Sequence, residues 1–299
     1  MRTSAMRTKD VAGQGDAVPS DGKVVDVGGP VFYREWDGPR DLTVVCVHGM
    51  GGSHRDWEGV AAMLASRGRV IALDLPGFGR SPRRGRRMTL SGAQAVLSGF
   101  LAMVADAPVV LIGTSFGGGI ASLQTARETA SVRGLILSSS YLPAFYGGWR
   151  APIVGVAMTT EQVGGMARGL RQSLLSSAVV RPADCADDES HEGRNDPAVR
   201  VSARDRRVAG VEAVTSLVGL SVRPWLAWRI YDQIHCPVLV LHGEEDQEVP
   251  VTWAYLAKRR HPDWELRVHA GVPHVVKLAN PEWWIRDVER WLDRLPPPA

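Results

Sequence analysis

The feature that most constrains the fold of this 299-residue chain is a series of short apolar runs separated by longer amphipathic stretches. The runs cover residues 44–47, 70–73, 109–112, 135–137, 238–241 and 266–268. Short runs without regular polar alternation are typical of strands buried on both faces, and parallel sheets flanked by helices contain such strands. The sequence therefore predicts an α/β fold with a mostly parallel sheet.

Patterns around these runs add a hairpin and helices to the sheet. Residues 24–27 and 31–33 are rich in β-branched and aromatic residues, and Gly28-Gly29 lies between the two runs, which predicts an antiparallel hairpin. Between residues 89 and 105, apolar residues recur at three- and four-residue steps, as on one face of an amphipathic helix. Asn280 before Pro281 is typical of an N-cap followed by a first-turn proline, so we expect a final helix there.

The spacing of the apolar runs changes in the middle of the chain, where residues 141–234 make a stretch of 94 residues. That is too long for an unstructured connection inside a compact domain, so the stretch is expected to contain helices. Helical spacing is seen at Val208, Val211, Val214 and Val218. Residues 163–174 show it too, whereas the polar stretch 184–197 predicts a loop. We therefore expect a core of residues 23–140 and 235–299, with 141–234 inserted as a helical cap.

Composition excludes several classes of protein. The net charge of +3 indicates no nucleic-acid partner. The sequence contains no stretch of eighteen apolar residues, so no membrane span is predicted. Cys46, Cys185 and Cys236 form no Cys-x-x-Cys pair and no zinc-ligand spacing, which favours a reducing compartment. Residues 1–22 lack the apolar segment of a secretory signal and are expected to be a disordered tail. We expect a cytoplasmic protein that acts on a small-molecule substrate without a metal or other cofactor; a homodimer stays open.

The densest chemical signal is Gly113-Thr114-Ser115-Phe116-Gly117, which directly follows an apolar run. A serine held at a sharp strand-to-helix turn needs glycine two residues before and two residues after it, because side chains there would collide with neighbouring backbone. Such a turn exposes the serine hydroxyl. Ser115 is therefore the candidate nucleophile, and a flexible glycine-rich loop is the alternative interpretation.

A serine hydroxyl needs a base within reach and a third group that orients this base. Among the eight histidines, His274 lies in a loop after the last predicted strand, and loops at the carboxyl ends of parallel strands gather functional residues. Asp246 belongs to an acidic cluster after the fifth apolar run, three residues beyond Gly243, where a short carboxylate can turn back towards the sheet. We expect Asp246 to orient His274, with the glutamates around it, Glu248 included, facing water.

Acyl transfer also needs hydrogen-bond donors for an oxyanion, and backbone amides usually supply them. The turn His48-Gly49-Met50-Gly51-Gly52 follows the first apolar run and can direct the amide of Met50 into the site. The amide of Phe116, the residue after the candidate nucleophile, would supply the second donor. His48 itself is expected to be structural, as a hydrogen-bond partner within its turn.

These motifs, together with Asp74-Leu75-Pro76-Gly77-Phe78-Gly79-Arg80-Ser81 and Asn280-Pro281-Glu282, resemble the α/β-hydrolase superfamily, in its branch of capped esterases, lactonases, haloperoxidase-like enzymes and carbon-carbon hydrolases. The resemblance implies Ser115 as nucleophile, His274 as base and Asp246 as orienting acid. It also implies a helical lid inserted after the strand that ends near Ser138. Relatives that are epoxide hydrolases or haloalkane dehalogenases place an aspartate at the nucleophile position, so those two reactions are not expected here.

The substrate pocket is expected between core and lid, and to be apolar and partly aromatic. Its candidate lining residues are Tyr141, Phe145, Trp149, Trp225 and Trp228. Packing within the lid is the alternative role for each of them. Five arginines between residues 80 and 87 could grip an anionic substrate, and a solvated loop is the alternative interpretation.

The leading hypothesis is a carboxylesterase-like serine hydrolase that cleaves an ester, thioester or lactone of a small to medium apolar substrate through an acyl-enzyme. Cleavage of a carbon-carbon bond in a vinylogous dioxo acid would use the same triad, but it needs cationic groups for the substrate carboxylate. A non-catalytic receptor on this scaffold is the third alternative. The full set of catalytic motifs argues against a receptor, because a binding protein has no need of all of them.

Overall fold

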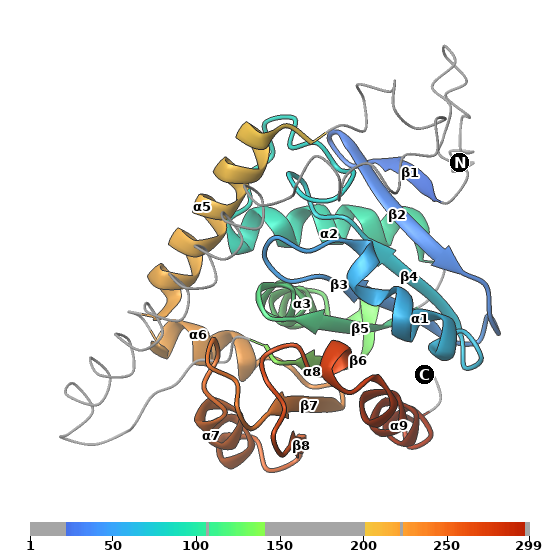
Figure 1. The fold of residues 1–299 in the computed structure, drawn as a ribbon, viewed down its shortest axis with the longest axis vertical. Helices are drawn as coiled ribbons and strands as arrows, with labels where there is room; N and C mark the ends of the chain where they lie inside the picture. The colour runs from blue at the N-terminus through green and yellow to red at the C-terminus, as the bar shows by residue number, and fades with distance from the viewer. Residues whose placement is uncertain (1–21, 106–107, 141–200, 222–223, 297–299) are drawn as a thin grey trace, which may run out of the picture.

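The computed structural model describes residues 22–105, 108–140, 201–221 and 224–296, and its strands form one sheet (Figure 1). The strands are β1 (Lys23–Asp26), β2 (Pro30–Trp36), β3 (Thr43–Val47), β4 (Arg69–Leu73), β5 (Val109–Thr114), β6 (Val132–Ser138), β7 (Val238–Gly243) and β8 (Glu265–His269). Their order across the sheet is β1-β2-β4-β3-β5-β6-β7-β8. β2 is antiparallel to both β1 and β4, and all other neighbouring pairs are parallel. The predicted hairpin and the mostly parallel sheet are confirmed.

Helices cover both faces of this sheet (Figure 1). They are α1 (Glu58–Leu64), α2 (Leu90–Val104), α3 (Phe116–Arg127), α5 (Ala203–Ser221), α6 (Pro224–Tyr231), α7 (Thr252–Arg260), α8 (Val276–Ala279) and α9 (Pro281–Leu292), with 3₁₀ turns η1 (His54–Trp57) and η2 (Thr129–Ser131). Helices α2 and α3 pack on one face, and α1 and α9 pack on the other. The flanked sheet explains why the strands appear in the sequence as apolar runs.

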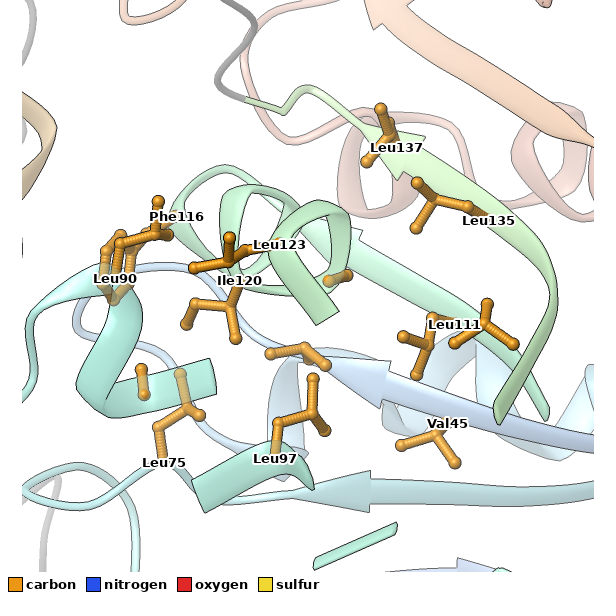
Figure 2. Packing of buried hydrophobic residues seen from close by; sticks show 14 of the residues in the cluster. Val45, Leu75, Leu90, Leu97, Leu111, Phe116, Ile120, Leu123, Leu135 and Leu137 are labelled. Atoms are coloured by element: carbon orange, nitrogen blue, oxygen red, sulfur yellow. The ribbon is translucent and has the colours of Figure 1, made fainter. Parts of the chain in front are cut away.

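Alternate side chains of each central strand enter two separate cores. On β3, Val45 and Val47 join the core under α2 and α3, whereas Val44 and Cys46 join the core under α1 and α9. Figure 2 draws part of the first core, in which strand residues such as Val45 belong to one cluster with residues of α2 and α3. Burying one such aliphatic side chain contributes roughly 1.5–3 kcal/mol, so burial on both faces fixes the central strands in place.

Side-chain caps start α2 and α9, and the cap of α9 is the one that the sequence predicts. Thr89 precedes α2, and its hydroxyl oxygen accepts a hydrogen bond of 3.1 Å from the amide of Gly92. Asn280 precedes α9, which begins at Pro281, and its side-chain oxygen accepts one of 3.2 Å from the amide of Trp283. Each cap satisfies an amide that has no acceptor inside its own helix.

Helices α5 and α6 lie between β6 and β7 in the chain, within the segment predicted as a cap. The buried apolar side chains of α5 are those of Ala209, Ala213, Leu217 and Leu220. Ala209 packs on Gly77 of the loop after β4, since a Cβ added to Gly77 would lie 2.6 Å from the Ala209 Cβ. Val211, a member of the predicted valine row, is 50% exposed. The packed face of α5 is therefore rotated away from the predicted one.

Part of the predicted organisation lies outside the described residues. This holds for the tail at residues 1–21, for the helix at 163–174, for the loop at 184–197, and for Tyr141, Phe145 and Trp149. The cap boundaries at residues 141 and 234 therefore stay a prediction. Within the described ranges, no helix combines the length and the apolar content that crossing a bilayer requires.

Candidate active site

Ser115 occupies the turn between β5 and α3. Its backbone has φ 52° and ψ −119°, a strained conformation that residues with a Cβ rarely adopt. The flanking glycines are needed for this turn. A Cβ on Gly113 would lie 2.5 Å from the carbonyl oxygen of Gly117, and a Cβ on Gly117 would lie 2.3 Å from the carbonyl oxygen of Val47. The predicted strand-to-helix turn is present, and it places Ser115 at the carboxyl edge of the sheet.

Asp246 and His274 form a hydrogen-bonded pair at the ends of β7 and β8. Nδ1 of His274 lies 2.7 Å from Oδ2 of Asp246, and Asp246 is only 7% exposed. The loop that carries His274 crosses close to the end of β7, because a Cβ on Gly243 would lie 2.2 Å from the carbonyl oxygen of Val272. The amide of Glu245 donates to that same carbonyl at 3.0 Å. Close backbone contact therefore brings the acid to the base.

A second histidine holds the same carboxylate. Nε2 of His242 lies 3.2 Å from Oδ2 of Asp246 and 2.8 Å from the carbonyl oxygen of Val249. Because a carbonyl only accepts hydrogen bonds, this nitrogen carries the proton and donates. Oδ1 of Asp246 accepts from the amides of Glu248 and Val249 at 2.9 and 2.8 Å. Burial raises the pKa of Asp246, but the hydrogen bonds from His242 and His274 outweigh it and lower this pKa to about 2. The carboxylate is thus ionised and fixed in position.

His274 is surrounded by opposing influences on its charge. Burial lowers its pKa, but the hydrogen bond to Asp246 and the negative charges of Asp246 and Glu248 outweigh burial, so the pKa is raised. The cation of Lys277 acts in the lowering direction. With the proton of the neutral ring on Nδ1 facing Asp246, Nε2 is left as an acceptor, and it lies 3.5 Å from Oε2 of Glu248. The ring can therefore take up a proton at Nε2.

Backbone hydrogen bonds hold the loops of the candidate site together at one edge of the sheet. The amide of Ser115 donates to the carbonyl of Ser138 at the end of β6 at 3.3 Å. The amide of Ser139 donates to the carbonyl of Leu241 in β7 at 2.8 Å. Loops after β5, β7 and β8 therefore leave the sheet at the same carboxyl edge, which is where parallel sheets collect functional residues.

The two backbone amides predicted as oxyanion donors belong to segments next to Ser115. The turn after β3 lies against the serine, because a Cβ on Gly49 would be 3.3 Å from the Cβ of Ser115. Met50 follows in that turn, and within the described residues its amide donates to no backbone carbonyl. Phe116 is the first residue of α3, so its amide has no acceptor inside the helix. Among the described residues, neither amide therefore donates to a backbone carbonyl.

His48 links the turn after β3 to the loop after β4. Its Nε2 accepts from the amide of Leu75 at 2.9 Å, so Nδ1 carries the proton and donates to the carbonyl of Gly49 at 2.6 Å. Burial lowers the pKa of His48, which keeps the ring neutral. The predicted structural role of His48 is confirmed.

The two predicted pocket aromatics of α6 have different surroundings. Trp225 is 60% exposed. Trp228 is 6% exposed and packs near Tyr231 and His261, and the guanidinium of Arg260 lies 5.1 Å from its ring centroid. Trp228 thus packs α6 against the end of α7. A pocket role for either tryptophan stays a prediction.

The arginine-rich loop is partly engaged by the protein itself. Nη2 of Arg83 lies 2.6 Å from Oε1 of Glu212 in α5. The guanidinium of Arg86 donates to the carbonyls of Val27, Gly29, Pro30, Pro82 and Arg83. These two arginines stabilise the fold. Neither interpretation from the sequence, a grip on an anionic substrate or a solvated loop, describes that role.

Sequence reasoning missed three polar groups near the acid and base. His242 lies four residues before Asp246 at a strand end, and Lys277 lies three residues after His274 among apolar residues. Those spacings are the signals that could have found them. Glu248 is not merely solvated, because it approaches the base. Within the described ranges, no cluster of three or more His, Cys, Asp or Glu side chains has the arrangement of a metal site.

Comparison with known proteins is consistent with this geometry. A family model described as the alpha/beta hydrolase family matches residues 44–286. This chain belongs to that family. The predicted family and fold class are therefore confirmed, and the chain is a hydrolase of the α/β fold.

The names of proteins similar to this chain refer to different substrates. The chain is 28% identical over 239 residues to the 2-hydroxy-6-oxo-6-(2'-aminophenyl)hexa-2,4-dienoic acid hydrolase of Metapseudomonas resinovorans, which covers 78% of this chain and 77% of the relative. It is 28% identical over 287 residues to the monoacylglycerol lipase of Mycolicibacterium smegmatis, covering 89% and 94%. The crystal structure of a putative lipase from Acinetobacter baumannii AYE superposes with a TM-score of 0.69 at 19% identity, over 92% of this chain and 91% of that one. This structural likeness shows the fold alone.

Proposed function

We propose that this α/β hydrolase is a serine hydrolase that cleaves a carboxylic ester, thioester or lactone of a small to medium apolar substrate through an acyl-enzyme. The observation that carries the proposal is the strained turn of Ser115 at the same sheet edge as the bonded pair of His274 and Asp246. Serine, histidine and a carboxylate in these roles form hydrolytic triads on several unrelated folds. A cytoplasmic location and a homodimer remain predictions from the sequence.

In the proposed reaction, Oγ of Ser115 attacks the carbonyl carbon while its proton passes to Nε2 of His274. The amides of Met50 and Phe116 donate to the resulting oxyanion, and each such donor typically lowers the barrier by about 3 kcal/mol. The tetrahedral intermediate breaks its bond to the leaving group, which takes the proton from His274. Asp246 keeps the imidazole oriented and stabilises its charged form.

Water completes the cycle by the same route. His274 removes a proton from the water molecule as its oxygen attacks the acyl carbon. The second tetrahedral intermediate then releases the acid, and the proton returns from His274 to Oγ of Ser115. No bound cofactor enters this accounting, because every proton is held by the serine, the histidine or a reactant.

A second candidate is hydrolysis of a carbon-carbon bond in a vinylogous dioxo acid, which the likeness to the dienoic acid hydrolase favours. That reaction needs a cation for the carboxylate of the substrate. Arg83 and Arg86 are already bonded to protein groups, so neither of these two arginines is free to bind that carboxylate.

The test is labelling with a fluorophosphonate followed by intact-mass analysis, and then turnover of aryl esters of graded chain length and of a dienoic dioxo acid. We expect one label per chain at Ser115 and faster turnover of short to medium esters. Ser115→Ala removes the nucleophile, so turnover should fall by at least about a thousandfold.

Ser122→Ala is the matched control, because it removes a hydroxyl from α3 that donates to the carbonyl of Gly118 at 2.8 Å. It should keep both the label and the turnover. Full ester turnover by the Ser115→Ala protein would refute the mechanism. An unlabelled parent without turnover would favour a receptor, and preference for the dioxo acid would favour the second candidate.

A further inference from the structure

Lys277 is a buried cation close to the candidate site. It is 2% exposed and lies in α8, three residues after His274. Its Nζ donates to Oγ1 of Thr114 at 3.3 Å and lies 4.3 Å from the ring centroid of Trp57. In the described part of the chain, no carboxylate lies within ion-pair distance of this nitrogen. A lysine almost never occupies such a position unless a partner compensates its charge.

Burying this ammonium works against folding at neutral pH. Burial lowers the pKa of Lys277 to about 8, even though the negative charge of Asp56 acts in the raising direction. An apolar side chain of similar size would avoid the cost of burying a charge. The position therefore carries a group that stability alone does not favour, as is common at functional sites.

The contacts of Lys277 join the two halves of the candidate triad. Thr114 is the residue directly before Ser115, whose positive φ depends on a fixed turn. Lys277 itself belongs to the first turn after His274, and the Trp57 ring of η1 makes a cation–π contact with its ammonium. One side chain thus connects the turn of the nucleophile with the turn that follows the base.

The charge of Lys277 also acts on the base. The groups that face His274 are Asp246 and Glu248 from the loop after β7 and Lys277 from α8. Lys277 is faced by Asp56 of η1 and Cys46 of β3, beside its bond to Thr114. Among these groups, Lys277 is the one whose positive charge opposes protonation of the imidazole.

We propose that Lys277 is a positioning residue for the reaction: its ammonium braces the Ser115 turn against the segment after His274 and favours the neutral imidazole that accepts the proton of the serine. This inference rests on the proposed serine hydrolase function. It predicts two separable effects, one of the hydrogen bond to Thr114 and one of the charge.

The experiment measures the rate of fluorophosphonate labelling from about pH 5 to pH 9, a range in which histidines titrate. Melting temperatures are measured in parallel. Lys277→Met removes both the charge and the hydrogen bond, while Thr114→Val removes the acceptor and keeps the charge. Lys23→Met is the matched control, because it makes the same change in net charge at a lysine of β1 whose side chain is 60% exposed.

For Lys277→Met, the acid limb of the labelling profile should move to higher pH, so that the rate at pH 6 relative to pH 8 falls about threefold. Its melting temperature at pH 7 should not fall. Thr114→Val should label about tenfold more slowly at every pH, with the limb unmoved. Lys23→Met should match the parent in the labelling profile, while its melting temperature falls slightly because the ion pair with Glu35 is lost.

A folded Lys277→Met protein whose acid limb stays in place would overturn the inference. If that variant does not fold, Thr114→Val still decides, because a parental labelling rate in that variant would rule out the brace. A parent that is not labelled at Ser115 would instead contradict the proposed function. The two failures are therefore distinguishable.

Discussion

The base of the candidate site is held between charges that change its pKa in opposite directions. Asp246 and Glu248 raise the pKa of His274, while burial and Lys277 lower it. Because Asp246 is itself fixed by His242 and by two backbone amides, the carboxylate has little freedom to follow the imidazole. Of the groups that change the pKa of His274, Glu248 is the one that reaches the site from the solvent side and can be substituted.

Glu248→Gln should therefore keep His274 unprotonated, and able to act as a base, down to a lower pH. Glu248 lies 3.5 Å from Nε2 of His274 and stabilises the protonated ring, so its neutralisation lowers the pKa of His274. The acid limb of kcat/KM for an aryl ester should move to lower pH, opposite to the change expected for Lys277→Met. Activity at pH 6 relative to pH 8 should rise by about twofold.

The control for this prediction is Glu244→Gln, which removes the same charge from an exposed residue of the same loop. Its profile should match the parent. A limb that moves equally in both variants would mean that only the net charge of the loop matters, and the specific role of Glu248 would be wrong.

The residues of the site differ in how far the sequence could predict them. Ser115 was predictable because the steric demand of its turn leaves a glycine pattern in the chain itself. Asp246 and His274 were predictable because both follow apolar runs that end at one sheet edge. His242 and Lys277 were not, because their roles depend on distances across the fold that no local pattern records.

Helix α5 shows the same limit for a larger unit. The helix was predictable from its spacing, but its packed face was not, since the row that contains Val211 turns out to be partly exposed. The face is instead set by the loop after β4, where Gly77 leaves room for the small side chain of Ala209. A helix inserted into a fold is oriented by the surface it covers, and that surface is assembled from distant segments.

Glu212 anchors α5 to the core, and its loss should destabilise the protein. Oε1 of Glu212 pairs with Arg83 at 2.6 Å, and Oε2 accepts from the amide of Met88 at 2.7 Å. Glu212→Ala leaves that amide without its partner, so the free energy of unfolding should fall by about 1–3 kcal/mol. Urea unfolding followed by circular dichroism measures this change.

Arg84→Gln serves as the comparison, because Arg84 is an exposed neighbour of Arg83 in the same loop. It should cost less than about 0.5 kcal/mol, as is usual for surface substitutions. Equal stabilities of the Glu212→Ala and Arg84→Gln proteins would show that α5 is held by apolar packing without help from its glutamate.

The whole molecule is organised by the sheet, and the sheet is what the sequence predicts best. Strands buried on both faces leave continuous apolar runs, and the order of the motifs along the chain follows from the parallel connections between them. The pairing of β2 with β4 was less predictable, because contact between strands that are not consecutive in the sequence depends on how the whole sheet is assembled. Glu35 of β2 reflects that arrangement, since it accepts from Lys23 of β1 at 2.8 Å and from Arg69 of β4 at 2.6 Å.

Two carboxylates, the half-buried Glu35 near one end of the strand order and the buried Asp246 after β7, make the fold sensitive to acid. Burial raises the pKa of Glu35, but its hydrogen bonds to Arg69 and Lys23 outweigh burial and lower this pKa to about 2, and that of Asp246 is also about 2. Both values lie below those of the unfolded chain, so each carboxylate stabilises the fold above about pH 4.5 and loses that effect as the pH falls towards 2.

Glu35→Gln should therefore lower the free energy of unfolding by about 1–2 kcal/mol at pH 7, where the carboxylate of the parent is ionised and bonded to two cations. Near pH 2 the parent carboxyl is becoming protonated, so the two proteins should converge in stability. Denaturant unfolding from pH 7 down to pH 2 measures both limits, with Glu244→Gln as the control expected to stay parallel to the parent. If the stability difference between Glu35→Gln and the parent persists unchanged at pH 2, the effect comes from the shape of the side chain. The charge of Glu35 would then contribute too little to hold the three strands together.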